Sequence, residues 1–119
     1  MPMYNVKIKH EFTALHQLMS DGRELEPLHS HDWVVEAIFT ATELDNTGCV
    51  IDFRDIDQLL KNTTDNWSDK GIGALSAEVI ARSIFDQIDI EFKKNDNSRV
   101  KIQSVTVWED MLHAGSFFQ

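Results

Sequence analysis

The chain has 119 residues, 42% of them hydrophobic and 26% charged, which suits one soluble domain over residues 1–119 and excludes disorder or a second domain. Its formal net charge of -9 repels phosphate backbones and anionic lipid, so nucleic acid and membrane surfaces are poor partners. With one cysteine, no apolar run of ~20 residues and no signal-peptide core, we expect a cytoplasmic protein without an internal disulfide.

Alternating apolar residues near the start of the chain predict a half-buried strand. Between Val6 and His16 the even positions are mostly apolar, so His16 shares the buried face. The segment 20–22, Ser-Asp-Gly, predicts a turn, and residues 23–28 predict a loop because Pro27 discourages helix. This loop leads to His29.

A second strand and a first helix are expected next. Residues 34–43 are mostly β-branched or aromatic and predict a strand, followed by a turn over 45–48 in which Gly48 takes a positive φ. Asp52 is a good N-cap for a helix that we expect to end by residues 62–64, before a polar loop over 65–75. Its apolar positions at helical spacing are Phe53, Ile56, Leu59 and Leu60.

The last third predicts a helix and two strands. The second helix starts after Ser76, and one face presents Ile80, Ala81, Ile84, Phe85 and Ile88. The last long strand changes parity near Ser104, which predicts a β-bulge, and the Phe-Phe pair at 117–118 closes the sheet. This element order predicts an α+β fold with an antiparallel sheet.

The sharpest chemical signal is the sequence His29-Ser30-His31. Residues i and i+2 of an extended chain project to the same side, so both imidazoles can bind one ion. Three protein ligands plus a water is the usual plan of a catalytic zinc site, and His16 is the expected third ligand. The alternative is an exposed His-x-His pair and a hydrogen-bonded core histidine at position 16.

A rival metal site would use Glu36 with the two histidines, as in the His-x-His-x4-Glu string of cupins. Strand alternation places Glu36 on the opposite face from His31, and two amphipathic helices fit poorly with an all-β jelly roll. This reading is therefore disfavoured.

Five stretches, in order along the chain, resemble the 6-pyruvoyl-tetrahydropterin and 6-carboxy-tetrahydropterin synthase family. They match the family patterns F-x-A-x-H-x-L, L-H-G-H-N-Y, G-M-V-x-D-F, P-T-x-E and V-x-V-x-E-T, and lie here at residues 12–18, 28–33, 48–53, 75–78 and 105–109. The resemblance implies the tunnelling fold, in which a four-stranded antiparallel sheet with two helices on one face assembles into intersubunit barrels, as a homo-oligomer (trimer or hexamer).

The resemblance also implies site residues. The histidines matching His16, His29 and His31 bind Zn2+, and the glutamate matching Glu109 anchors the pterin ring. Residues matching Ser76 and Glu78 lie near the pterin, although a first-turn glutamate such as Glu78 also stabilises a helix N-terminus. For Glu109 the alternative is a solvated strand end.

The chain departs from the family at its proton-transfer residues. Residues 23–28 lack the family cysteine, and residues 67–70, Trp-Ser-Asp-Lys, lack the Asp-His pair. Cys49 is expected to be a small buried hydrophobe instead. The candidates to replace the missing groups are Glu26, which resembles a glutamate in a subgroup associated with folate synthesis, then Asp69 and His113.

Three functions follow from these observations. The first is a zinc-dependent pterin lyase acting on 7,8-dihydroneopterin triphosphate or a close relative. The second is a zinc- and pterin-binding protein without lyase activity, and the third is a structural oligomer. Turnover separates the first two, because both predict the same metal and ligand.

Overall fold

The computed structural model of the chain describes residues 3–16, 19–20, 23–24, 27–70, 72, 75–95 and 98–119. Seven of these are described by their backbone alone: His16, Met19, Ser20, Arg23, Glu24, Asp69 and Lys70. The elements are β1 (Tyr4–His16), β2 (Met19–Ser20), β3 (Arg23–Glu24), β4 (His29–Ala41), α1 (Phe53–Lys70), α2 (Ala77–Lys94), β5 (Lys101–Trp108) and β6 (Ala114–Phe118).

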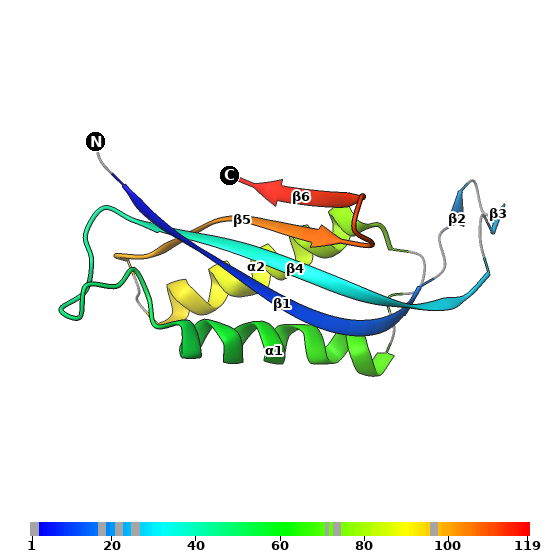
Figure 1. The fold of residues 1–119 in the computed structure, drawn as a ribbon, viewed down its shortest axis with the longest axis horizontal. Helices are drawn as coiled ribbons and strands as arrows, with labels where there is room; N and C mark the ends of the chain where they lie inside the picture. Colours follow the sequence, from blue (N-terminus) through cyan, green and yellow to red (C-terminus); the bar gives the residue numbers. More distant parts are fainter. Residues whose placement is uncertain are drawn as a thin grey trace.

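Four strands form one antiparallel sheet in the order β1-β4-β5-β6, which confirms the predicted α+β class (Figure 1). The short strands β2 and β3 pair with each other where the sequence predicted only a turn and a loop. Between β4 and β5 the register shifts at Ile38/Phe39, opposite Ser104 and Ile102, so the predicted bulge is present.

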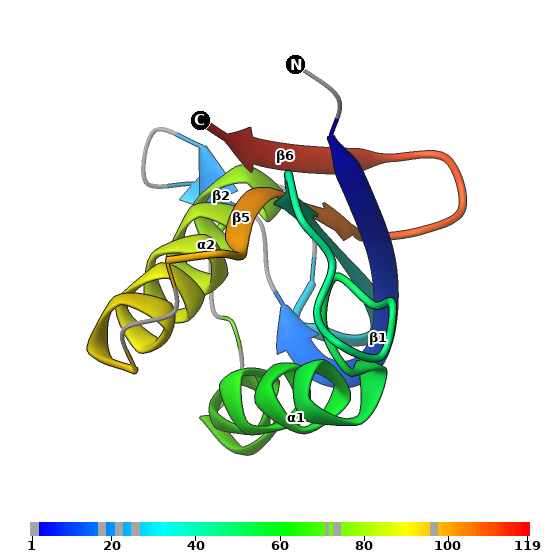
Figure 2. The same cartoon turned by 90° about the vertical axis from the view of Figure 1, so that its left-hand side faces the viewer.

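Both helices cover the same face of the sheet, as Figure 2 shows end-on. Helix α1 packs on β1, while α2 packs on β5 and β6. The core between these layers includes the fully buried Trp33, Phe39 and Phe85. The predicted inner face of α2 is confirmed, since all five of its apolar residues are buried.

Helix α1 is longer than the sequence predicted, and the expected loop over residues 65–75 is wrong in its first half. The sequence predicts a helix end near Thr63 and Thr64, but both residues are buried within α1. Their hydroxyls donate to the carbonyls of Leu59 at 2.8 Å and Leu60 at 2.9 Å, so neither polar group is left without a partner. The helix therefore continues to Lys70.

Two predicted burials are also wrong. Phe53, at the first position of α1, has 58% of its surface exposed, because the helix turns only its later apolar residues toward the sheet. Cys49 is exposed in the turn before α1 rather than buried. The predicted N-caps are confirmed: the Asp52 carboxylate accepts the Arg54 N–H at 2.9 Å, and the Ser76 hydroxyl accepts the Val79 N–H at 3.3 Å.

The topology gathers five chain segments at one end of the molecule. The end of β1, the start of β4, the end of α1, the start of α2 and the β5–β6 turn all lie at the right of Figure 1. The Ile72 N–H donates to the Leu15 carbonyl at 2.8 Å, which ties the segment after α1 to the end of β1. In the described part of the chain, no helix is long and apolar enough to cross a membrane.

Candidate functional site

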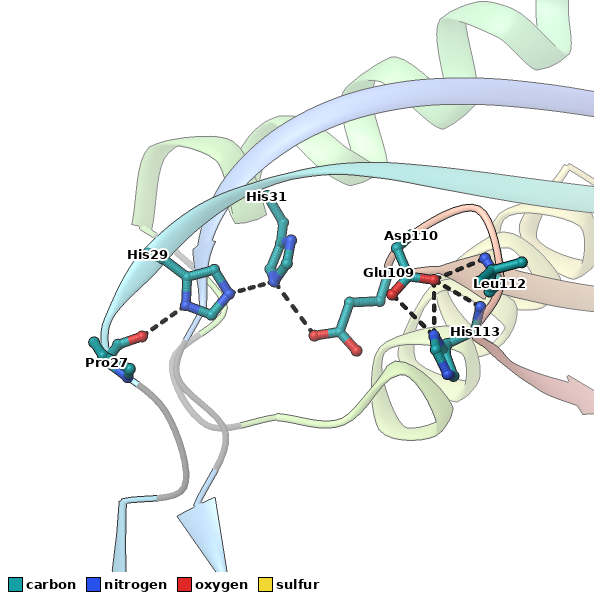
Figure 3. A network of polar contacts seen from close by, with 7 residues as sticks. All are labelled: Pro27, His29, His31, Glu109, Asp110, Leu112 and His113. Carbon is teal, nitrogen blue, oxygen red and sulfur yellow. Dashed lines mark hydrogen bonds and ion pairs between the residues drawn. The ribbon is translucent and has the colours of Figure 1, made fainter.

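His29 and His31 open strand β4 and project from the same face as the buried Trp33. Both side chains are partly buried, and their rings are 4.1 Å apart between centroids at an angle of 76°. Their Nε2 atoms point toward each other and are in contact (Figure 3). The rings of His31 and Trp33 pack edge to face, with 5.5 Å between their centroids. Because Trp33 is fully buried, the histidine pair adjoins the hydrophobic core.

A backbone carbonyl fixes the ring of His29. Its Nδ1 lies 2.6 Å from the Pro27 oxygen, and because a carbonyl only accepts, Nδ1 must carry the proton. In the neutral ring Nε2 then holds the lone pair that is directed at His31. This is the arrangement by which proteins orient histidines that bind metals.

His16 lies directly across from His29 in the β1–β4 ladder, as the last pair of that ladder. The sequence predicted this proximity from the parity of the first strand. Paired residues in an antiparallel ladder lie about 4.5–5.5 Å apart between Cα atoms. Among the side chains that the structure describes, no three His, Cys, Asp or Glu converge as a metal would require, and the side chain of His16 is outside that set.

Glu109 directly follows β5 and lies beside the histidine pair of β4. Its Oε1 lies 3.4 Å from Nε2 of His31, and the two side chains are 29% and 26% exposed. The sequence placed Glu109 in a ligand site without predicting this contact. A carboxylate and two imidazoles are thus brought together at the edge of the core.

Ser76 and Glu78 lie at the same end but contact other groups. Ser76 caps α2, and Glu78 follows in the first turn of that helix. A Cβ at Gly115 of β6 would lie 2.4 Å from Glu78 Oε1 and 2.7 Å from its backbone nitrogen, so a glycine is needed for this close approach. The described contacts of both residues are with α2 and β6, not with the histidines.

The three candidate proton-transfer residues have different positions. Glu26 lies outside the described residues, and Asp69 is placed by its backbone in the last turn of α1. His113 precedes β6, and its Nδ1 lies 2.9 Å from both carboxylate oxygens of Asp110. Sequence analysis missed Asp110, whose only signal is its place three residues before His113.

Glu36 belongs to the other face of the sheet, as strand alternation predicted. Its carboxylate lies 3.8 Å from the Lys9 ammonium, across the β1–β4 ladder. It is therefore not a ligand alongside His31.

Comparison with known proteins addresses the fold and the family of the chain. No protein with a curated functional description matches the sequence. Solved structures match over the whole chain: C. elegans 6-pyruvoyl tetrahydropterin synthase (18% identity, TM-score 0.76, 97% of that chain) and an uncharacterized Wolinella succinogenes protein (16%, 0.72, 99%). A Plasmodium vivax 6-pyruvoyltetrahydropterin synthase with a substituted catalytic residue also matches over the whole chain (15%, 0.65, 99% of that chain).

These likenesses show the fold. The sequence model of 6-pyruvoyl tetrahydropterin synthase matches residues 5–118, nearly the full length. The chain therefore belongs to the 6-pyruvoyl tetrahydropterin synthase family, whose members are lyases of pterin metabolism.

Proposed function

We propose that the protein is a zinc-dependent pterin lyase acting on 7,8-dihydroneopterin triphosphate or a close relative. The observation that supports this most directly is a pair of successive contacts: His29 Nε2 meets His31 Nε2, and His31 Nε2 lies 3.4 Å from Glu109 Oε1. Metal-binding and ring-binding groups are thus adjacent, as a pterin with a reactive side chain requires.

The donor set suits zinc. The Pro27 carbonyl holds His29 with its Nε2 lone pair toward His31, and His16, which pairs with His29 in the ladder, would be the third ligand. Zinc bound there would supply a Lewis acid for the hydroxyl groups of the substrate side chain.

Glu109 would bind the pterin ring. A carboxylate accepts two parallel hydrogen bonds from the amino and imino groups of a pterin, which fixes the ring in one orientation. Because Glu109 also neighbours His31, a ring bound to it would direct its side chain toward the histidines. Ser76 and Glu78, at the start of α2, would lie beside this ring.

Proton transfer would fall to Glu26, with Asp69 and His113 as the other candidates. The Plasmodium vivax structures carry alanine or cysteine in place of a catalytic glutamate, which supports a glutamate in this role. A carboxylate in a partly desolvated pocket is a competent general base.

The second candidate function is binding of zinc and pterin without lyase activity. It is favoured by the missing family cysteine and Asp-His pair. The one cysteine cannot replace the first of these, because Cys49 lines a hollow with Tyr4 at the start of β1, at the opposite end of that 13-residue strand from His16.

The test is incubation of the zinc-loaded protein with 7,8-dihydroneopterin triphosphate, with products identified by mass. We expect about one zinc per chain and conversion of the substrate. His16→Ala, His29→Ala and His31→Ala should each lose the metal and the activity, whereas His10→Ala, a matched control on β1, should keep both. Bound pterin without product would favour the second function, and zinc retained in all three variants would overturn the metal site.

A further inference from the structure

The turn between β5 and β6 holds a hydrogen-bonded Asp-His pair. The Asp110 carboxylate accepts the backbone N–H of Leu112 at 2.7 Å and of His113 at 2.8 Å. The Nδ1 of the His113 ring lies 2.9 Å from each oxygen of the same carboxylate (Figure 3). Asp110 is thus fixed by the backbone, and it fixes the ring in turn.

These contacts decide which ring nitrogen is available. The Leu112 N–H, followed by the His113 ring and its backbone N–H, holds the pKa of Asp110 below its ordinary value, so the carboxylate is ionised at neutral pH. An ionised carboxylate only accepts, so His113 Nδ1 is the donor. When the ring is neutral, Nε2 carries the lone pair and is the basic atom.

The pair lies next to the residues of the proposed site. The Glu109 N–H donates to the His113 carbonyl at 3.0 Å, so these two residues are opposite each other where the hairpin begins. His113 directly precedes β6, whose Gly115 and Phe117 face α2. The His113 side chain is 73% exposed and open to a ligand, and Glu109 beside it reaches His31.

We propose that Asp110 and His113 form a proton-transfer pair of this site, an inference that rests on the proposed lyase function. Nε2 of His113 takes a proton from the pterin side chain as its hydroxyl or carbon ionises, and gives that proton to the product or to water. Asp110 is a positioning residue, because it holds the ring in the reactive tautomer and stabilises the imidazolium.

The competing explanation is that the pair only closes the turn. The first measurement does not depend on activity: nitrogen NMR of His113 should show the Nδ1–H tautomer, and Asp110→Asn should abolish that preference. Equal tautomer signals in the wild type and Asp110→Asn would overturn the proposal.

The second measurement is kinetic. His113→Ala should lower turnover on the order of a hundredfold while zinc content and binding of an inert pterin analogue stay the same. Added imidazole should restore part of the rate, because the exposed position leaves room for it. The matched control is Leu112→Ala, at an exposed position of the same turn, and its turnover should stay within about twofold of the wild type.

A double-mutant cycle then identifies the role of Asp110. Asp110→Asn should slow the wild type by about tenfold to a hundredfold but should add nothing to His113→Ala, since it acts through that ring. Three outcomes overturn this inference alone. His113→Ala keeps full turnover, His113→Ala loses zinc, or Asp110→Asn slows the wild type and His113→Ala equally. A wild type without turnover overturns the proposed function and this inference with it.

Discussion

At the scale of single residues, Glu109 and Glu26 are expected to act in different steps. Glu109→Gln should weaken the binding of any pterin, whether product or inert analogue, about tenfold to a hundredfold, because it removes a charge-assisted contact to the ring. Glu26→Gln should leave analogue binding nearly unchanged and lower turnover on the order of a hundredfold. Calorimetry with an inert analogue and steady-state kinetics measure the two effects, and zinc content should be unchanged in both variants.

Full turnover in Glu26→Gln would remove Glu26 from proton transfer and leave that role to the other candidates. The order of tests is then His113, which is bonded to Asp110, and Asp69, which lies in the last turn of α1. Unchanged analogue binding in Glu109→Gln would contradict the ring-binding role.

Asp45, in the turn before α1, should give the protein a dependence of stability on pH. Its carboxylate accepts the Thr47 hydroxyl at 2.6 Å and the backbone N–H groups of Thr47 and Cys49. The Thr47 hydroxyl, then these N–H groups, hold the pKa of Asp45 below its ordinary 3.8. Because the folded pKa is the lower one, the ionised group stabilises the fold above pH 3.8 and loses this effect as pH falls through the folded pKa.

Asp45→Asn should therefore lower the urea midpoint at pH 7, and its difference from the wild type should close below about pH 3.8. Thr47→Val is the matched variant, since it removes the leading donor and should raise the pKa of Asp45 in an NMR titration. If the urea midpoints of the wild type and Asp45→Asn differ by the same amount from pH 7 to pH 3, ionisation of Asp45 is not the cause of the difference.

The backbone positions of the three proposed metal ligands could be predicted from the sequence because strand periodicity and one register determine them. His29 and His31 share a face by alternation, and His16 pairs with His29 as the last residue of β1. The contact between Asp110 and His113 could not be predicted, because it depends on the path of a five-residue turn. The role of a carboxylate in such a turn is set by geometry that residue types alone do not specify.

At the scale of elements, the α2 N-terminus and β6 meet through a glycine. Gly115→Ala would place a Cβ 2.7 Å from the Glu78 backbone nitrogen, so the helix or the strand must shift. We expect a loss of roughly 1–3 kcal/mol in the free energy of unfolding, measured by urea denaturation. Ala114→Ser changes the preceding, exposed residue, and its free energy of unfolding should stay within about 0.5 kcal/mol of the wild type. Equal midpoints for the two variants would contradict this close contact.

Helix boundaries were the least predictable part of the fold. Thr63 and Thr64 have low helix propensity and predicted an end, but burial of Thr64 and the bonds of both hydroxyls to the preceding turn outweigh that preference. The N-caps were predicted correctly, because the Asp52 and Ser76 side chains act on backbone N–H groups two and three residues away. Local signals thus determined where the helices begin, and packing determined where α1 ends.

At the scale of the whole molecule, the sheet has two open edges. β1 and β6 are the outer strands of the order β1-β4-β5-β6, and each presents one row of backbone groups with no partner in this sheet. Exposed edges favour pairing with another chain, and the family to which this chain belongs is oligomeric. We therefore expect a trimer or hexamer in which β1 of one subunit pairs with β6 of the next.

The hydrogen-bonding pattern of β6 shows how to test this assembly. The Glu109 N–H bonds to the His113 carbonyl and the Gln119 N–H to the Gln103 carbonyl. Since bonded and non-bonded pairs alternate in an antiparallel ladder, the Thr106–Ser116 pair is non-bonded, and the Ser116 N–H points away from β5 toward the open edge. Proline at position 116 would remove that outward donor while every β5–β6 backbone bond remains.

Ser116→Pro should therefore shift the protein toward monomer in sedimentation velocity at micromolar concentration, where the wild type sediments as a trimer or larger. Ser116→Ala is the matched control, because both variants lose the 2.7 Å hydroxyl contact with Thr106 but alanine keeps the N–H. A monomeric wild type would contradict edge pairing altogether. An oligomer that survives Ser116→Pro with a folded circular dichroism spectrum would place the interface on another surface, so the subunits would not join their sheets through β6.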